Sequence, residues 1–340
     1  MLSLKRVAAV LLPVSSFFLH APAHVQTFPL RDATGLIAPR VKAESAAYLG
    51  RKSVRITMEG DDHDGLALLP GTENFQDGTI EADIALKVTM PPEVRYPGFI
   101  GIAFRARSDT SHFELFYVRP GNSDAPDQLT RDHAVQYSSE PNFGWYDLRR
   151  AWPGAYEANA DIAPNAWTHL RIVVAGRSAK LYLNGSSHAS LVVNDLKGED
   201  LRGAIGLWGF TDEECYFSNV RITPATPVDI KNGSDAAGSW EMRYFNDVTG
   251  MAAQMDLQRN GDKLTGTWSG PLGKSLPITG TWRNGYVELS FAGEWPSTSR
   301  KGTPGPVTTY MTGWFDGDSA KGRMRVSGRS DGTWAAERKH

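Results

Sequence analysis

The sequence predicts an all-β protein made of a two-sheet jelly-roll sandwich followed by a small up-and-down antiparallel barrel. Three observations favour this class. The 340 residues include 34 glycines and 10 tryptophans, and Gly-rich turns between short aromatic strands are typical of all-β chains. About eight strand-like runs and no convincing long helix lie between residues 78 and 222, which indicates a sandwich of short antiparallel strands. A Thr-Gly-Thr-Trp signature recurs near the C-terminus.

The clearest predicted strand covers residues 78–88, where apolar residues alternate with Glu81, Asp83 and Lys87. This alternation places one apolar face against a core and the other face in water, as in an antiparallel sheet packed on one side. Asn184-Gly185 is a strong hairpin signal. Further strands are expected at residues 53–58, 99–106, 112–119, 167–175, 179–183, 203–210 and 215–222.

Two neighbouring predicted strands carry polar residues among apolar ones. Because side chains alternate along a strand, Glu114 and Arg119 are expected on opposite faces. Arg105 is expected to share a face with the small residues Gly101 and Ala103, which leave room above the sheet. Two environments stay open for Glu114: burial on a half-covered face raises the pKa of this carboxyl, whereas an open face leaves it solvated.

The C-terminal unit, residues 238–340, is expected to be a meander of about eight short strands that closes on itself and so removes its exposed edges. Its tryptophans are expected to fill the barrel, since aromatic residues dominate small cores. The repeated signature ends at Trp268, Trp282, Trp314 and Trp334. Residues 224–237 are poor in large apolar residues and are predicted to be an interdomain linker.

The N-terminus predicts export. Lys5 and Arg6 precede an apolar run, and Ala21-Pro22-Ala23 has the pattern of a cleavage site, so residues 1–23 are a predicted signal peptide cleaved near Ala23. The run is too short for stable membrane insertion. A secreted chain with a single cysteine, Cys215, has no intrachain disulfide and indicates a bacterial periplasmic or extracellular protein. Cys215 itself is expected to be a buried small hydrophobe.

The charge of the chain excludes one class of partner. The formal net charge is -2, and no cluster of Lys or Arg stands out. Nucleic-acid-binding proteins carry basic patches, so no nucleic-acid partner is expected.

A long connection after residue 119 is the candidate functional segment. It spans some 45 residues, far more than the usual few, and such loops are functional or disordered. It is too rich in Trp and Tyr for disorder. Aromatic rings beside arginines suit a sugar, because the rings stack on it and the charged groups bind hydroxyls. The expected binding residues are Arg105, Arg119, Gln136, Tyr137, Trp145, Arg149 and Trp152. A structural flap that covers the sandwich is the alternative.

For cleavage of a glycosidic bond, two carboxylates usually flank the bond. Glu114 is the expected acid or base, with Asp127 or His133 as its partner. The candidate carboxylates are Glu114, Asp124, Asp127, Asp132, Asp147 and Glu157. No cofactor motif is visible. A metal hypothesis at Asp61, Asp62, His63 and Asp64 gives way to a solvated turn, so no metal site is expected.

Several segments resemble the strands of the concanavalin A-like lectin/glucanase superfamily, which includes laminin G-like domains. They are NFQDGTIEADI, WTHLRIVVAG, AKLYLNG, GAIGLWGF and YFSNVRI, and they imply a concanavalin A-like sandwich at residues 27–223. GIAFRARS and HFELFYVRP resemble the 3-keto-disaccharide hydrolase family, which implies that Arg105 and Glu114 are site residues on a concave face. Phe116 stands where that family tends to have glutamine. The C-terminal unit resembles the small calycin-like barrels of secreted bacterial proteins.

The expected function is that of a secreted carbohydrate-active protein. The concave face of the jelly roll, capped by residues 119–165, is expected to bind an oligosaccharide or polysaccharide. Two versions stay open: a glycoside hydrolase-type enzyme that cleaves a glycosidic or keto-glycosidic bond, and a non-catalytic lectin. An envelope structural or protein-interaction module is a third reading from a different class.

Overall fold

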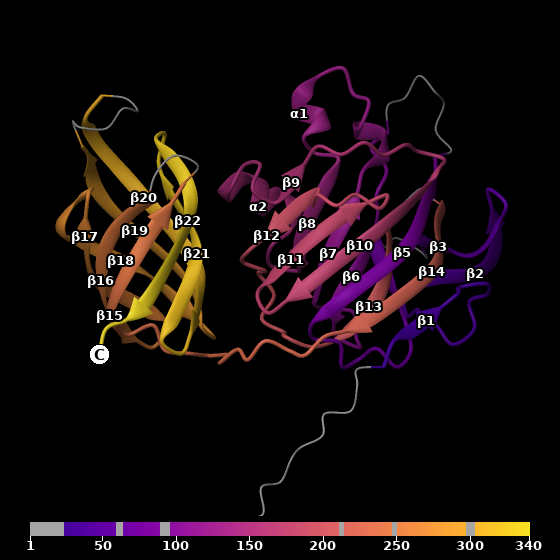
Figure 1. The fold of residues 1–340 in the computed structure, drawn as a ribbon, viewed down its shortest axis with the longest axis horizontal. Coiled ribbons are helices and arrows are strands. Elements are labelled where there is room, and N and C mark those ends of the chain that lie inside the picture. The colour runs from indigo at the N-terminus through magenta and orange to yellow at the C-terminus, as the bar shows by residue number, and fades with distance from the viewer. Residues whose placement is uncertain (1–23, 59–63, 89–95, 211–213, 247–249, 297–302) are drawn as a thin grey trace, which may run out of the picture.

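The computed structural model describes residues 24–58, 64–88, 96–210, 214–246, 250–296 and 303–340. It confirms the predicted fold class: two antiparallel sheets form a sandwich, and a closed eight-stranded barrel lies beside it (Figure 1). The predicted signal peptide, residues 1–23, lies outside the described residues, as do Asp61, Asp62 and His63 of the metal hypothesis. No helix of the described residues is long and apolar enough to cross a membrane.

The larger sheet of the sandwich has eight strands in the order β12-β11-β10-β5-β14-β3-β2, with β1 also paired to β14. Its strands are β1 (Gln26–Phe28), β2 (Val41–Tyr48), β3 (Arg51–Met58), β5 (Gly78–Lys87), β10 (Trp167–Ala175), β11 (Ser178–Leu183), β12 (Leu191–Val193) and β14 (Glu214–Pro224). The predicted alternation at residues 78–88 is confirmed, because Ile80, Ala82 and Ile84 are buried in the core.

The smaller sheet has six strands in the order β4-β13-β6-β7-β8-β9. They are β4 (Asp64–Leu68), β6 (Ile100–Ala106), β7 (Phe113–Val118), β8 (Val135–Glu140), β9 (Glu157–Ala158) and β13 (Ala204–Phe210). All neighbouring strands are antiparallel. Tyr117 of β7 lies opposite Gly101 on one side and Gln136 on the other, so the three share one face of the sheet.

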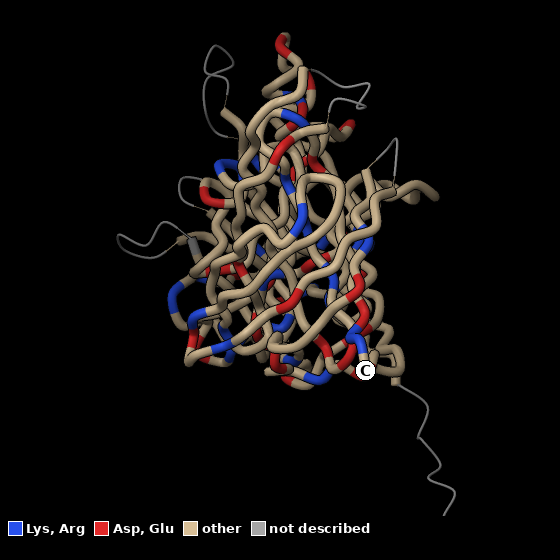
Figure 2. Tube along the Cα trace, turned by 90° about the vertical axis from the view of Figure 1, so that its left-hand side faces the viewer, with Lys and Arg blue, Asp and Glu red and all other residues tan. Residues whose placement is uncertain are grey.

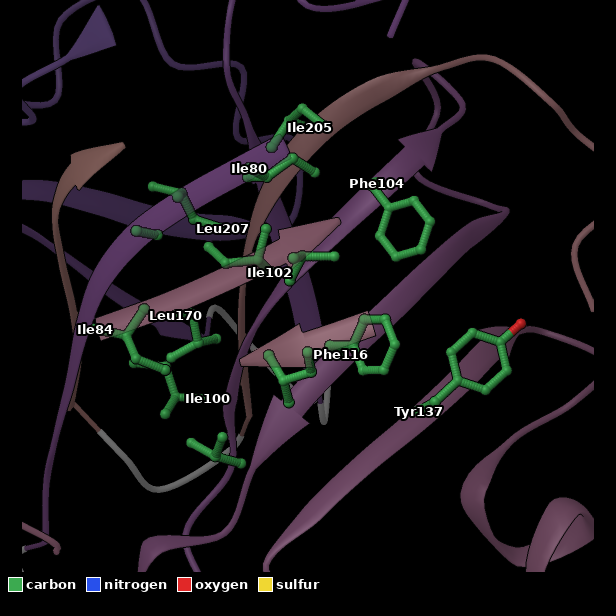
Figure 3. Close-up of a cluster of buried hydrophobic side chains, with 14 of the residues drawn as sticks. Ile80, Ile84, Ile100, Ile102, Phe104, Phe116, Tyr137, Leu170, Ile205 and Leu207 are labelled. Carbon is green, nitrogen blue, oxygen red and sulfur yellow. The ribbon is translucent and has the colours of Figure 1, made fainter. Parts of the chain in front are cut away.

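The core of the sandwich lies between the two sheets. Figure 3 shows Ile80, Ile84 and Leu170 of the larger sheet packed with Ile102, Phe104 and Phe116 of the smaller one. Cys215 is also buried there, as predicted. Tyr137 lies at the edge of this cluster, and its hydroxyl points away from the apolar side chains (Figure 3). At Tyr137 the apolar core therefore meets polar groups, since the Tyr137 hydroxyl is hydrogen-bonded to Glu114.

The long connection after residue 119 has more regular structure than the sequence predicts. It contains a short 3-10 helix (Pro120–Asn122), α1 (Gln128–Arg131), α2 (Trp145–Ala151) and the two strands β8 and β9. β8 buries Val135 and Tyr137 in the core and turns Gln136 to the outer face. The alternation is present but short, because polar residues follow Tyr137, and pairing with β7 is what makes this segment a strand.

The barrel is closed by β15 (Gly238–Phe245), β16 (Gly250–Asn260), β17 (Lys263–Gly270), β18 (Gly273–Arg283), β19 (Tyr286–Trp295), β20 (Gly305–Asp316), β21 (Ser319–Val326) and β22 (Ser330–Arg338). Trp268 and Trp334 fill its interior, as predicted. Trp314 departs from the prediction, since it faces outward and its indole Nε1 donates a hydrogen bond of 2.7 Å to the Leu196 carbonyl of the sandwich.

A buried ion pair of the sandwich lies at the contact with the barrel. Lys197 and Asp195 lie 2.9 Å apart, with side chains 1% and 2% exposed. The Lys197 Nζ also donates to the Tyr286 hydroxyl of the barrel, at 3.0 Å. The segment 225–237 is docked rather than free, because Asn232 accepts a hydrogen bond from Arg177 and the Ser234 hydroxyl accepts one from the Gly317 amide of the barrel. Figure 2 shows acidic and basic positions intermingled along the described chain.

Candidate functional site

The polar residues of the six-stranded sheet form two groups, one on each side of it. The first, which we call the outer-face cluster, lies on the face turned away from the core. It comprises Tyr117, Arg119, His133, Gln136, Trp145, Arg149 and Glu157. β7, β8 and β9 place Tyr117, Gln136 and Glu157 in one row across the sheet. α2 and the loop before β8 bring the other members to this row.

Glu157 is the centre of the outer-face cluster. Its side chain is only 3% exposed, and it accepts three hydrogen bonds from Arg149, at 2.7, 3.0 and 3.1 Å. The Nε2 atom of His133 lies 3.2 Å from the same carboxylate. Bidentate arginine–carboxylate pairs are strong and fix geometry as well as charge. The carboxylate is therefore held in one orientation between a cation and an imidazole.

Arg119 packs beneath this pair. Its guanidinium donates to the Tyr117 hydroxyl at 2.7 Å, to the Gln136 side-chain oxygen at 3.3 Å and to the His133 carbonyl at 2.9 Å. The Gln136 amide in turn donates to the Tyr156 carbonyl at 3.0 Å. A buried cation with this many partners is satisfied within the protein, so its role is to orient its neighbours.

Trp145 is the exposed part of the outer-face cluster. It is 44% exposed, although the guanidinium carbon of Arg149 lies 4.8 Å from its ring centroid and that of Arg119 lies 6.0 Å away. Large apolar side chains with a polar neighbour are typical of surfaces that bind a ligand by stacking. An accessible indole thus lies against Arg149, the arginine that holds the Glu157 carboxylate.

The electrostatics of the cluster favour a neutral imidazole. Burial lowers the pKa of His133, and the adjacent Glu157 carboxylate only partly offsets this effect. Burial also lowers the pKa of Arg119 and raises the pKa of Tyr117. A histidine that is neutral near pH 7 is able to accept a proton, which is the requirement for a general base.

The second group, the sandwich-end cluster, comprises Arg105, Glu114, Tyr137 and Lys197. Glu114 lies on the core side of the sheet and is 1% exposed. It accepts hydrogen bonds from the Tyr137 hydroxyl and from the Gly198 amide at 3.0 Å. A side chain at Gly198 would place its Cβ 2.6 Å from the Glu114 Oε1, so any larger residue there would displace the Glu114 carboxyl. Burial raises the pKa of Glu114, although its hydrogen bonds and the nearby Arg105 oppose the rise.

A bulge in β6 moves Arg105 away from the face that the sequence predicts. Its φ is +52°, and the register of β6 against β13 shifts at this point. The guanidinium therefore leaves the row of Gly101 and Ala103 and forms a buried ion pair of 2.9 Å with Asp77. It also donates to the Gly176 carbonyl at 2.8 Å, so Arg105 ties the two sheets together at the end of the sandwich.

Two hollows adjoin this end of the sandwich. A cavity of about 50 Å³ is lined by Glu114, His112, Ser139 and Lys197 among others, and it has room for one or two waters. An open polar cleft of about 680 Å³ is bordered by Arg105, Asp77, Arg202 and the segment 227–232. The carboxyl of Glu114 therefore borders a narrow, partly open hollow of about 50 Å³, which is too small for a sugar ring.

The structure brings together five of the predicted site residues and separates the rest. Arg119, His133, Gln136, Trp145 and Arg149 all belong to the outer-face cluster, whereas Arg105, Glu114 and Tyr137 belong to the sandwich-end cluster.

The other two predicted site residues have structural partners. Asp127 is the N-cap of α1, where its carboxylate accepts a hydrogen bond of 2.8 Å from the Thr130 amide. Trp152 is 6% exposed and packs in the sandwich core.

Glu157 and Tyr117 complete the cluster without a distinguishing signal in the sequence. Glu157 is one of six candidate carboxylates, and only its pairing with Gln136 across β8 and β9 separates it from the other five. Tyr117 shares a strand face with Arg119, so alternation alone links these two. Among the described residues, no group of three or more His, Cys, Asp or Glu side chains is arranged to hold a metal ion.

A family model matches the sandwich. The family is described as the 3-keto-alpha-glucoside-1,2-lyase-like domain, and its model matches residues 47–223, slightly more than half of the chain. The match covers both clusters and ends before the barrel. A comparison with curated proteins found no match.

Solved structures with similar folds share little sequence with the chain. A carbohydrate-binding module of Bacillus subtilis, CBM66, is 20% identical, with 56% of this chain and 96% of that chain covered and a TM-score of 0.39. A B. subtilis protein of unknown function with a galectin-like fold is 13% identical, with 60% and 96% covered and a TM-score of 0.41. An endo-β-galactosidase from Clostridium perfringens that releases GlcNAcα1-4Gal is 9% identical, with 96% and 99% covered and a TM-score of 0.32.

Proposed function

Because the chain belongs to the family of 3-keto-alpha-glucoside-1,2-lyase-like domains, we propose that it binds a saccharide at the outer-face cluster and cleaves a 3-keto-glycosidic bond there. One observation carries the proposal. The buried carboxylate of Glu157 is held by Arg149 and faces the imidazole of His133, whose pKa is lowered by burial. Arg149 also lies against the indole of Trp145, which is 44% exposed. This arrangement combines a stacking platform for a sugar ring with a base that has a fixed partner.

The chemistry of a 3-keto-glycoside suits such a base. The carbonyl at C3 acidifies the proton on C2, and His133 is the group that accepts this proton. The electron pair of the C2–H bond then forms a double bond between C1 and C2, the C1–O bond breaks, and the second sugar leaves and takes up a proton. No oxidant or reductant is required, and later addition of water to the double bond makes the net reaction a hydrolysis.

Each member of the cluster has a role in this proposal. Trp145 stacks on the sugar, and Glu157 orients His133 and stabilises the imidazolium that forms. Arg149 holds Glu157 and contributes positive charge near the enolate that develops at C3. Arg119 and Gln136 support the pair from below.

The test uses 3-keto-trehalose, an α-glucoside oxidised at C3, with product analysis by mass spectrometry. His133→Gln is expected to lower turnover by at least about 100-fold while binding persists, because general-base catalysis contributes that much. A substrate deuterated at C2 is expected to react more slowly with the unaltered protein, since the C2–H bond breaks. Full turnover by His133→Gln would show that another group removes the proton.

The stacking role is tested with a matched pair. Trp145→Ala is expected to weaken binding by roughly tenfold, whereas Phe245→Ala is expected to leave it unchanged. Phe245 is an aromatic residue of similar exposure, at 45%, and it lies on β15 of the barrel. Equal losses in the two variants would place the sugar elsewhere.

A non-catalytic, lectin-like function is the second candidate. It is favoured by the three hydrogen bonds between Arg149 and Glu157, which occupy both carboxylate oxygens. A lectin needs this rigidity but no free base. Binding of 3-keto-trehalose or of the parent trehalose without any product would select this reading over cleavage.

We also propose that the chain is exported. The proposal rests on the charged, apolar and small-residue pattern of residues 1–23. Expression in a bacterium followed by N-terminal sequencing of the secreted or periplasmic protein is expected to give a chain that starts at His24. A protein that retains Met1 in the cytoplasm would contradict it.

A further inference from the structure

The barrel reaches the loop that carries the outer-face cluster. Arg323 and Arg325 are two residues apart on β21, so both side chains leave the same face of the barrel wall, while Met324 between them points inward. The guanidinium carbon of Arg325 lies 5.0 Å from the centroid of the Trp152 ring, and that of Arg323 lies 4.9 Å from the centroid of the Tyr156 ring.

Polar contacts fix these two arginines. The Arg323 Nη2 donates to the Ala155 carbonyl at 3.3 Å, and its Nε lies 3.4 Å from Asp195. The Arg325 Nε forms an ion pair of 2.9 Å with Asp331 of the neighbouring strand, which holds its guanidinium over Trp152. Trp152 and Tyr156 are only 6% and 1% exposed, so both cation–π contacts are largely shielded from water. Cation–π contacts are stronger when they are desolvated.

Residues 152–156 join the two halves of the outer-face cluster. They follow α2, which supplies Trp145 and Arg149, and they precede Glu157 at the start of β9. The Tyr156 carbonyl accepts hydrogen bonds from the Tyr137 amide at 2.8 Å and from the Gln136 side chain at 3.0 Å. A shift of Tyr156 therefore moves Glu157 relative to His133 and Gln136.

We propose that Arg323 and Arg325 of the barrel are positioning residues for the saccharide site. They clamp Trp152 and Tyr156, and thereby hold α2 and β9 at the separation that the Arg149–Glu157 pair requires. The proposal rests on the proposed function of the outer-face cluster. It assigns the barrel a part in the site, although the family match ends at residue 223 and does not include it.

The test is a double variant, Arg323→Ala with Arg325→Ala, in the full chain. Affinity for 3-keto-trehalose is expected to fall by roughly tenfold, equivalent to about 1.4 kcal/mol. The conservative Arg325→Lys variant keeps a cation over Trp152 and is expected to retain most of the affinity. Arg243→Ala serves as the control, since Arg243 is an exposed arginine on β15, which pairs with β16 and β22 of the barrel.

Hydrogen exchange separates this inference from the proposed function, because it needs no sugar. In the double variant, amides of residues 145–157 are expected to exchange faster, whereas those of β13 keep the rate of the unaltered protein. Unchanged exchange and affinity in a folded double variant would overturn the inference. A second outcome also overturns the inference: the double variant exchanges faster, but the unaltered protein binds no sugar. The two arginines would then hold the loop in place without any saccharide site.

Discussion

The two clusters of the six-stranded sheet differ in the partners of their carboxylates and in the exposure of the groups around them. On the outer face, Glu157 is paired with Arg149 and faces His133, and the neighbouring Trp145 is open to solvent. At the sandwich end, Glu114 has no ion pair among the described residues, and a tyrosine hydroxyl and a backbone amide satisfy it beside a cavity of about 50 Å³. The first carboxylate is held in an ion pair next to exposed groups, and the second is buried beside a narrow hollow.

From this difference we infer that the outer-face cluster is a binding surface and that the sandwich-end cluster is structural. A ligand site must exchange water for ligand, so it needs exposed groups next to fixed ones. The sandwich-end cluster instead lies where the barrel packs on the sandwich. The backbone amide of Lys197 donates a hydrogen bond to the Tyr137 hydroxyl, and its ammonium donates one to the Tyr286 hydroxyl of the barrel. A raised carboxyl pKa marks functional sites and structural networks alike, so the pKa of Glu114 alone does not identify a catalytic acid.

The largest expected effect lies at the sandwich end. Lys197→Met removes the nearest cation of the buried Asp195, which then keeps the Arg323 Nε at 3.4 Å and the Tyr156 hydroxyl at 2.7 Å. The variant is expected to lower the free energy of unfolding by about 3 kcal/mol, because a buried carboxylate loses its closest ion pair. Urea denaturation measures the loss. Burial acts to lower the pKa of Lys197, but Asp195 and nearby tyrosines outweigh it and raise this pKa, which keeps the ammonium charged at neutral pH.

Lys42→Met is the control for this variant. Lys42 pairs with Glu44 at 2.7 Å, but its side chain is 54% exposed, and exposed pairs contribute less than about 1 kcal/mol. The double variant Asp195→Asn with Lys197→Met removes both charges and is expected to recover part of the lost stability. A loss for Lys197→Met no larger than that for Lys42→Met would show that the interface tolerates the unpaired charge.

Much of this comparison can be predicted from alternation along the strands. It places Glu114 and Arg119 on opposite faces of one strand, and the structure has them there. It cannot predict the position of Arg105, because a bulge with φ of +52° interrupts the alternation. A bulge re-aims one side chain without a strong signal in the sequence.

Long-range pairing accounts for the rest of what the sequence leaves open. β8 and β9 are short and polar, so only their neighbours in the sheet define them, and with them the position of Glu157. In the sequence, Trp314 is one member of a repeat and Lys197 is one residue of a loop. Their roles depend on contacts between the barrel and the sandwich, which the sequence does not show. The contacts of both residues join segments more than eighty positions apart.

The intermediate effect lies on the outer face. Glu157→Gln leaves Arg149 unpaired, but that side chain is 30% exposed and water solvates it, so a loss of about 2 kcal/mol of stability is expected. Turnover of 3-keto-trehalose is expected to fall by at least about tenfold, because the variant loses the carboxylate that orients His133 and stabilises its imidazolium. Asp147→Asn is the matched control, since Asp147 is 57% exposed and lies 3.7 Å from Arg150. If both variants turn over 3-keto-trehalose at the rate of the unaltered protein, the Glu157 carboxylate is not part of the site.

The smallest effect at any one pH is expected for Glu114→Gln, which keeps the shape of the side chain and an oxygen to accept the Gly198 amide. At pH 5 the change in the free energy of unfolding is expected to stay below about 1 kcal/mol.

The pH dependence of stability is the sharper test of Glu114. Burial raises the pKa of Glu114 in the folded state, so as the pH rises above the ordinary value of 4.5 the unfolded chain loses its proton first. The stability contributed by protonated Glu114 is therefore complete below that pH and is lost as the pH climbs through the folded pKa. Urea midpoints from pH 5 to 8 are expected to decline for the unaltered protein relative to the glutamine variant, because all other titrating groups are common to both. Parallel midpoints would mean that Arg105 and Arg177 already hold Glu114 as a carboxylate, and the sandwich end would then be a charged site like the outer face.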